Sequence, residues 1–270
     1  MKILYLIIAS NNFEHICDEE SQRNTWAKSQ DNIVWLRGGK EEKYDSIKRT
    51  LYVQVEETYE NILKKTIQGV RWCAENLEFD YLIRSNVSTY FVEKRVRELL
   101  GKENPQGLFL GGFIEFINDK KIPYNKRQFV NGAAIFLNRK AVEILLTLQP
   151  EDWNTKPDDY AISQFLISKG VCPCWIPRGN IGATSMLLKR AYYRLKSSEN
   201  PRMASKRMEN LCRVLNSKTV STSIKSIAIY YLDEIRNAKQ NHKSILRYCK
   251  SVYSVQASKA KFLALKNFGI

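Results

Sequence analysis

Short apolar runs alternate with stretches of helical periodicity over residues 1–180, and this alternation restricts the chain to few folds. Such runs are typical of buried strands, and apolar residues three and four apart are typical of helices. We expect strands at residues 2–9, 33–36, 51–55, 80–84, 107–113, 134–137 and 173–176. We expect helices at residues 21–28, 59–75, 93–100, 139–148 and 158–169. This order predicts an α/β domain built on a mainly parallel sheet flanked by helices.

The predicted sheet also indicates where a ligand would bind. In sheets of this kind, ligands bind at the carboxyl ends of the strands. The loop after Ile83 and the loop before Asp158 are therefore candidate site loops. The sequence contains neither a Gly-x-Gly-x-x-Gly run nor a Walker sequence, which argues against dinucleotide-binding and P-loop folds.

Positive charge is concentrated at the C-terminal end of the chain. Residues 1–180 carry 25 Lys/Arg and 24 Asp/Glu, whereas residues 181–270 carry 18 and 4. From residue 199 the sequence indicates helices at 203–215, 224–240 and 244–263, which predicts a basic helical C-terminal region over residues 199–270. A basic appendage on a neutral body favours an anionic partner such as membrane lipid, nucleic acid or an acidic glycan; the alternative is a solubilising surface.

The cysteines and the N-terminus bear on the cellular compartment. Among the six cysteines, Cys172 and Cys174 are the one close-spaced pair. No second close pair completes a zinc framework, which argues against a structural zinc site. Scattered thiols among apolar residues indicate a reducing compartment. The apolar run at residues 2–9 is too short to cross a bilayer. We therefore expect a cytoplasmic protein.

Four segments, in order, carry a resemblance to a known family. They are Arg23-Asn24-Thr25-Trp26, residues 57–66 with Trp72, the strand and turn at residues 81–91, and residues 131–137 followed by Asp158-Asp159-Tyr160. Over residues 3–196 the chain resembles the fringe and β-1,3-galactosyltransferase family. The resemblance implies a Rossmann-type, GT-A-like domain at residues 1–198 and an inverting transfer of a sugar from a nucleotide-sugar donor.

Inverting transfer requires a base that takes the proton of the acceptor hydroxyl. Asp159 stands at the position of the family's Glu-Asp-Val aspartate, and Asp158 is the second candidate. Both residues open a predicted helix, where the helix dipole favours a charged carboxylate. The alternative is that the two aspartates only cap this helix.

The transfer also needs positive charge for the departing diphosphate. The family binds a divalent metal through Asp-Asp-Asp, but this sequence has Asn86-Val87-Ser88 there. Mn²⁺ or Mg²⁺ is therefore doubtful as a cofactor, with Asn86 and Ser88 as a weak alternative site. Basic side chains are the predicted replacement, because they bind phosphate oxygens well. They are Lys189, Arg190, Arg194, Lys196 and Arg84.

The remaining predicted site residues follow from the same resemblance. Arg23, Ser85, Asn86 and Ser88 are expected on the donor side, although Arg23 is equally explained by holding its loop. On the acceptor side, Gly132 is expected to permit a close backbone approach, and Trp153 is expected to stack on a sugar or to pack in its loop.

The sequence thus favours transfer of a hexose or N-acetylhexosamine from a UDP-sugar to a glycan or lipid-linked acceptor, in the synthesis of a bacterial surface polysaccharide or lipid-linked oligosaccharide. Residues 203–263 are expected to attach the protein peripherally to the anionic inner face of the membrane. An inactive sugar- or nucleotide-binding module is the main alternative. A DNA-modifying glycosyltransferase is the other, although the sequence has no nucleic-acid-binding motif.

Overall fold

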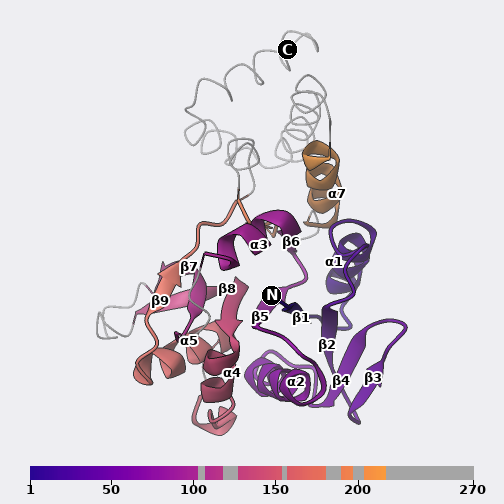
Figure 1. The fold of residues 1–270 in the computed structure, drawn as a ribbon. Helices are drawn as coiled ribbons and strands as arrows, with labels where there is room; N and C mark the ends of the chain where they lie inside the picture. The colour runs from indigo at the N-terminus through magenta and orange to yellow at the C-terminus, as the bar shows by residue number, and fades with distance from the viewer. Residues whose placement is uncertain (103–106, 118–126, 154–156, 181–189, 197–203, 217–270) are drawn as a thin grey trace, which may run out of the picture.

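The computed structural model describes residues 1–102, 107–117, 127–153, 157–180, 190–196 and 204–216 (Figure 1). Its main sheet has the strand order β3-β4-β2-β1-β5-β8-β7-β9. The strands are β1 (Ile3–Ile8), β2 (Ile33–Gly39), β3 (Lys43–Asp45), β4 (Thr50–Gln54), β5 (Tyr81–Asn86), β7 (Leu110–Phe116), β8 (Gln128–Asn138) and β9 (Pro173–Trp175). A second sheet pairs β6 (Thr89–Phe91) with β10 (Tyr192–Arg194).

The centre of the main sheet is parallel, as the sequence predicts. Strands β4, β2, β1 and β5 run in the same direction, and β8 runs antiparallel to both of its neighbours, β5 and β7. The described helices are α1 (Phe13–Asn24), α2 (Ile62–Asn76), α3 (Glu93–Leu100), α4 (Arg139–Leu145), α5 (Asp158–Ser168), α7 (Ala204–Leu215) and the 3₁₀ turn η2 (Pro150–Trp153). The fold class is therefore α/β, with a mainly parallel sheet flanked by helices.

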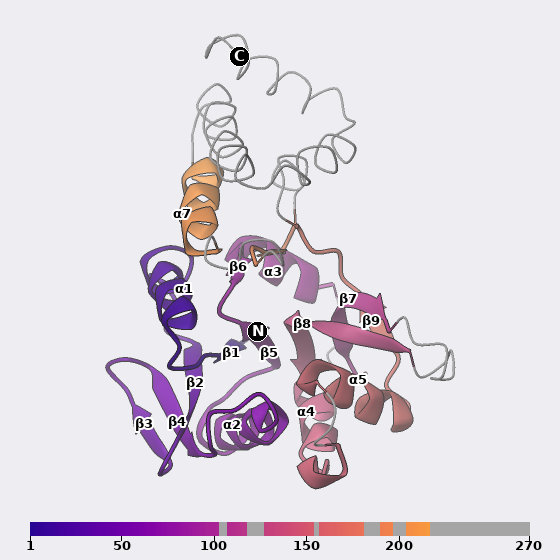
Figure 2. The same ribbon diagram turned by 180° about the vertical axis from the view of Figure 1, so that it is seen from behind.

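Both faces of the sheet are covered by other parts of the chain. Consecutive residues of a strand point to opposite faces, so alternate residues of β1 belong to different cores. Ile3, Tyr5 and Ile7 of β1 pack in the core shared with α3, α7 and the small sheet. Leu4, Leu6 and Ile8 pack in the other core, with α2, α4 and α5. In Figures 1 and 2, α3 and α7 lie above the level of the sheet, and α2 and α4 lie below it.

The first helix differs from its prediction. We expected a helix at residues 21–28, whereas α1 spans Phe13–Asn24. Asn12 caps the helix, because its side chain accepts a hydrogen bond from the backbone N–H of His15. The buried residues of α1 are polar, so apolar periodicity did not mark the helix. The prediction also missed β3, the short strand at the edge of the sheet.

Helix α7 belongs to the folded core, although the sequence placed it in an appendage beginning at residue 199. Its residues Ala204, Met208 and Leu211 are buried in the same core as β1. Figure 1 shows α7 beside α1. The apolar side of α7 is therefore unavailable to a lipid surface, and the predicted helices at 224–240 and 244–263 lie outside the described residues. None of the described helices is long and apolar enough to cross a membrane.

The contact between α1 and α7 buries a carboxylate. Asp18 is 6% exposed and accepts a hydrogen bond from the backbone N–H of Ser205. Burial raises the pKa of Asp18 to about 7, and the positive charge of Lys196 opposes this rise. An unfolded aspartate titrates near about 3.9, so folding is disfavoured progressively as the pH rises from that value to about 7.

We expect Asp18→Asn to stabilise the protein above pH 7 by about 1–3 kcal/mol, because the amide keeps the hydrogen bond without a buried charge. The gain should be much smaller at pH 4.5, where folded Asp18 is already protonated. Urea unfolding at pH 4.5 and pH 8 measures both values, with the exposed Glu20→Gln as the control. An equal effect at the two pH values would contradict the assignment.

Candidate active site

Four segments from distant parts of the chain meet at the edge of the sheet where β1 and β5 end. Ile8 of β1 is paired with Asn86 of β5. The start of α5 reaches this edge through Asp159, which bonds to Gly132 of β8. The small sheet brings the end of β10 alongside, because the backbone N–H of Leu195 donates to the Ser88 carbonyl over 3.0 Å. This edge is where the sequence predicted the site.

Asp159 is held at this edge by two backbone hydrogen bonds. Its Oδ2 accepts from the Gly132 N–H over 2.8 Å, and its Oδ1 accepts from the Tyr160 N–H over 2.8 Å. Burial and the neighbouring charge of Asp158 raise the pKa of Asp159, whereas Arg84 and the two backbone bonds lower it. A fixed carboxylate with a raised pKa is suited to act as a general base.

Gly132 lies close to two charged side chains. A Cβ atom at this position would lie 2.8 Å from Nη1 of Arg84 and 3.1 Å from Oδ2 of Asp159. Any side chain at residue 132 would therefore displace the two charged groups that contact its peptide. The predicted role of Gly132 in acceptor binding stays a prediction. Trp153 ends η2, and its side chain lies outside the described part of the structure.

Asp158 differs sharply from Asp159. It is 5% exposed, its Oδ2 lies 2.6 Å from Nη2 of Arg84, and it accepts a hydrogen bond from the hydroxyl of Thr66 over 3.1 Å. A carboxylate enclosed in an ion pair cannot reach an acceptor hydroxyl, so Asp158 is unsuited to be the base. Neither aspartate only caps the helix, since both make contacts with other strands or helices.

Arg84 does not have the donor-binding position that the sequence predicted for it. Its side chain is 2% exposed, and its two terminal nitrogens bond to Asn86 Oδ1, the Gly132 carbonyl and Asp158. The guanidinium is therefore turned into the protein, where it pairs with a carboxylate. Periodicity and motifs could not reveal this partner, which lies 74 residues along the chain.

The turn after β5 does not fit a divalent cation. Val87 is 1% exposed and packs in the core, Ser88 is 4% exposed, and Asn86 Oδ1 accepts from Arg84. Hard cations need several oxygen ligands, mostly carboxylates. In the part of the chain that the structure describes, no three His, Cys, Asp or Glu residues are grouped to hold a metal. Ser85 and Ser88, predicted on the donor side, have buried side chains, and Ser85 donates to the Ala133 carbonyl over 2.6 Å.

A positive side chain, that of Lys196, lies at this edge just after β10. Lys196 is exposed, and its charge lowers the pKa of His15 and of Asp18, although burial is the larger influence on both. Lys196 therefore faces the first turns of α1 across the end of β1. Arg194 is half-buried beside Lys196, and Arg190 is half-buried before β10. Lys189 lies outside the described residues.

Arg23 lies in the last turn of α1 and contacts other residues of the protein. It pairs with Glu19 over 2.7 Å, and its guanidinium lies 3.6 Å from the centre of the Trp35 ring. Glu19 also pairs with Arg37 over 2.5 Å, and Arg37 donates to the side chain of Asn11 over 2.7 Å. Arg23 thus holds α1 to the sheet rather than extending toward a ligand.

The sequence analysis missed two groups of polar residues at this edge. His15 bonds through Nδ1 to the Ser10 hydroxyl over 2.7 Å, directly after β1. Glu115 at the end of β7 accepts from Arg178 over 2.8 Å and from Asn131, next to Gly132, over 3.1 Å. No motif marks either group, because their members become neighbours only through the fold.

No protein-family model matches the chain, and no curated protein matches it. Among solved structures, a glycosyltransferase involved in glycosylation of the major capsid of PBCV-1 is 12% identical, with a TM-score of 0.50 over 76% of this chain and 99% of that chain. The galactosyltransferase LgtC is 9% identical, with a TM-score of 0.45 over 80% and 98%. The mannosyltransferase PcManGT of Pyrobaculum calidifontis is 8% identical, with a TM-score of 0.45 over 99% and 81%. At these identities the first similarity shows the fold alone, which is of the GT-A type.

Proposed function

We propose that this chain is an inverting glycosyltransferase that moves a sugar from a nucleotide-sugar donor to an acceptor hydroxyl. The observation that carries the proposal is the position of Asp159. The carboxylate is fixed by the Gly132 and Tyr160 N–H groups at the ligand-binding edge of a GT-A-type fold. Lys196 follows β10 and its charge acts on His15, and Arg194, the last residue of β10, lies near Arg178. A base and a phosphate-binding cation are the two groups that this chemistry requires.

In the proposed reaction, Asp159 accepts the proton of the acceptor hydroxyl as its oxygen attacks the anomeric carbon. The bond from that carbon to the diphosphate oxygen breaks on the opposite side, which inverts the configuration. Lys196 and Arg194 stabilise the negative charge that collects on the nucleoside diphosphate. No step passes through a metal ion, because the residues of the β5–β6 turn do not fit one.

We propose a UDP-sugar carrying a hexose or N-acetylhexosamine as the donor and a glycan or lipid-linked acceptor. These finer assignments rest on the family resemblance. Attachment to an anionic membrane surface in the cytoplasm remains a prediction for the residues after α7. The replacement of all three family carboxylates in the β5–β6 turn favours one alternative, a sugar- or nucleotide-binding module without turnover.

The experiment is a panel of UDP-sugars with simple glycoside acceptors, assayed for released UDP and glycoside product in EDTA and in Mn²⁺. Turnover that is unchanged by EDTA supports the proposal. Turnover that requires Mn²⁺ contradicts the assignment of charge neutralisation to side chains. Tight binding of UDP without any turnover supports the binding module instead.

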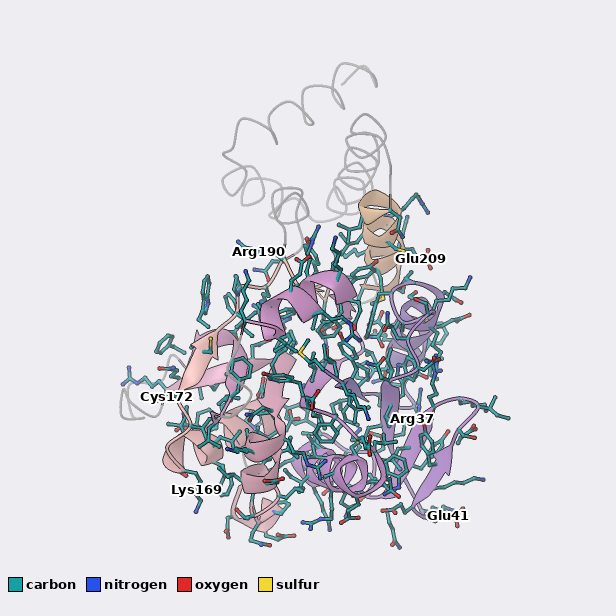
Figure 3. The ribbon with its side chains drawn as sticks, viewed as in Figure 1. Arg37, Glu41, Lys169, Cys172, Arg190 and Glu209 are labelled. Atoms are coloured by element: carbon teal, nitrogen blue, oxygen red, sulfur yellow. The ribbon has the colours of Figure 1, made fainter. Side chains whose placement is uncertain are left out.

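We expect Lys196→Met to raise the donor KM about 10- to 100-fold, because one charge-assisted bond to phosphate contributes about 1.5–3 kcal/mol. Lys169→Met is the matched control, because exposed Lys169 follows the C-terminal end of α5, whereas Asp159 lies in the first turn of that helix. Figure 3 shows Lys169 at the lower left, far from Arg190. UDP titration calorimetry separates binding from chemistry. A donor KM that is equal in the two variants would remove Lys196 from the diphosphate site.

A further inference from the structure

The Gly132 peptide is held from both sides by charged groups. Its N–H donates to Asp159, and its carbonyl accepts from Nη1 of Arg84 over 2.6 Å. A Cβ atom at residue 132 would contact both Arg84 and Asp159, so these two side chains also pack against the α-carbon of Gly132. The position of Asp159 is therefore coupled through one peptide to the position of Arg84.

Arg84 is itself fixed by groups from several parts of the fold. Nη1 also donates to Asn86 Oδ1 over 2.8 Å, and Nη2 pairs with Asp158 over 2.6 Å. Asp158 is in turn bonded to Thr66 of α2. Asp158 directly precedes Asp159, so the ion pair between Arg84 and Asp158 holds the first turn of α5 against β5.

We propose that Arg84 is a positioning residue: through the Gly132 carbonyl and Asp158 it fixes where the Asp159 carboxylate lies and supplies the positive charge that faces it. The inference deepens the proposed function, because it rests on Asp159 being the base. It assigns to Arg84 a role in the reaction without contact with donor or acceptor.

Charged and titratable groups reach Asp159 from each neighbouring element. Asp158 lies beside it on α5, and Arg84 approaches from β5. Tyr59 lies in the segment before α2. Burial raises the pKa of Tyr59, and the negative charge of Asp159 is the second cause of this rise. From β8 the neighbour is the neutral Gly132 N–H. Within the described residues, Arg84 is the positive group that lowers the pKa of Asp159.

The first test needs no turnover and therefore separates this inference from the proposed function. Carboxyl-carbon NMR of aspartate-labelled full-length protein, with Asp159→Asn for assignment, follows the Asp159 titration directly. We expect Arg84→Gln to raise the pKa of Asp159 by about one unit or more, since a nearby arginine lowers a carboxyl pKa by about 1–3 units. The exposed Arg71→Gln is the control and should leave it unchanged.

The second variant, Arg84→Lys, keeps the charge and covers the case in which Arg84→Gln does not fold. One ammonium cannot reproduce the planar geometry of the guanidinium toward its separate acceptors. We expect the Asp159 titration to stay near the wild-type value while kcat falls about 10- to 100-fold with a donor KM changed less than threefold.

Several results overturn the inference. One is a folded Arg84→Gln protein with an unshifted Asp159 titration. Another is an Arg84→Lys enzyme with wild-type kcat. A wild-type protein without turnover refutes the proposed function, and in that case the NMR titration still decides whether Arg84 sets the ionisation of Asp159.

Discussion

Asp159→Asn is expected to lower kcat for sugar transfer about 10²- to 10⁴-fold, the usual contribution of a positioned general base. The asparagine carbonyl can still accept the hydrogen bond of the Gly132 N–H, so the local fold should persist. Binding of UDP, measured by calorimetry, should change little, because the proposed base acts on the acceptor hydroxyl and not on the diphosphate. The exposed Asp31→Asn is the matched control and should retain wild-type kcat.

The pH profile gives the same prediction a second readout. Only the deprotonated carboxylate accepts a proton, so kcat/KM of the wild type should rise with pH through the pKa of Asp159. Burial and Asp158 raise this pKa, so the rise should occur above the range of an ordinary aspartate. The rise should vanish in Asp159→Asn. A variant with wild-type kcat, or with an unchanged acid limb, would exclude Asp159 as the base.

The sequence predicted the elements whose burial follows a simple pattern. The apolar runs that became β1, β2 and β5 are covered on both faces, and α3 was predicted with both of its ends. The fold class is confirmed, because alternating strands and helices leave few ways to cover such a sheet. Helix α1 was misplaced, because its buried side chains, including Asp18 and Gln22, are polar and are satisfied by partners elsewhere in the chain.

The sequence indicated where the site lies better than it indicated which partners the charged side chains of the site have. Gly132 and Asp159 were identified by resemblance, and the structure brings them into contact. Arg84 was predicted to bind the donor, and Arg23 was predicted either to bind the donor or to hold its loop, because the sequence does not show which carboxylate a basic residue pairs with. Their carboxylates, Asp158 and Glu19, decide their roles, and one of these partners is distant in sequence.

The buried ion pair between Arg84 and Asp158 predicts the largest change in stability. Asp158→Ala leaves a guanidinium that is 2% exposed without its ion-pair partner, and Arg84 Nε has no acceptor among the described residues. We expect the free energy of unfolding in urea to fall by about 3–5 kcal/mol, because an unpaired buried charge is strongly destabilising.

The double variant Arg84→Met/Asp158→Leu removes both charges and should recover at least half of that loss, since well-packed apolar pairs replace buried ion pairs at little cost. The exposed pair of Arg139 and Glu143, 3.6 Å apart, provides the control, and Glu143→Ala there should cost less than about 1 kcal/mol. If Asp158→Ala and the double variant were equally unstable, the loss would come from packing and from the Thr66 hydrogen bond. Recovery in the double variant without recovery of kcat would show that the pair is kept for the position of Asp159, because stability alone does not require it.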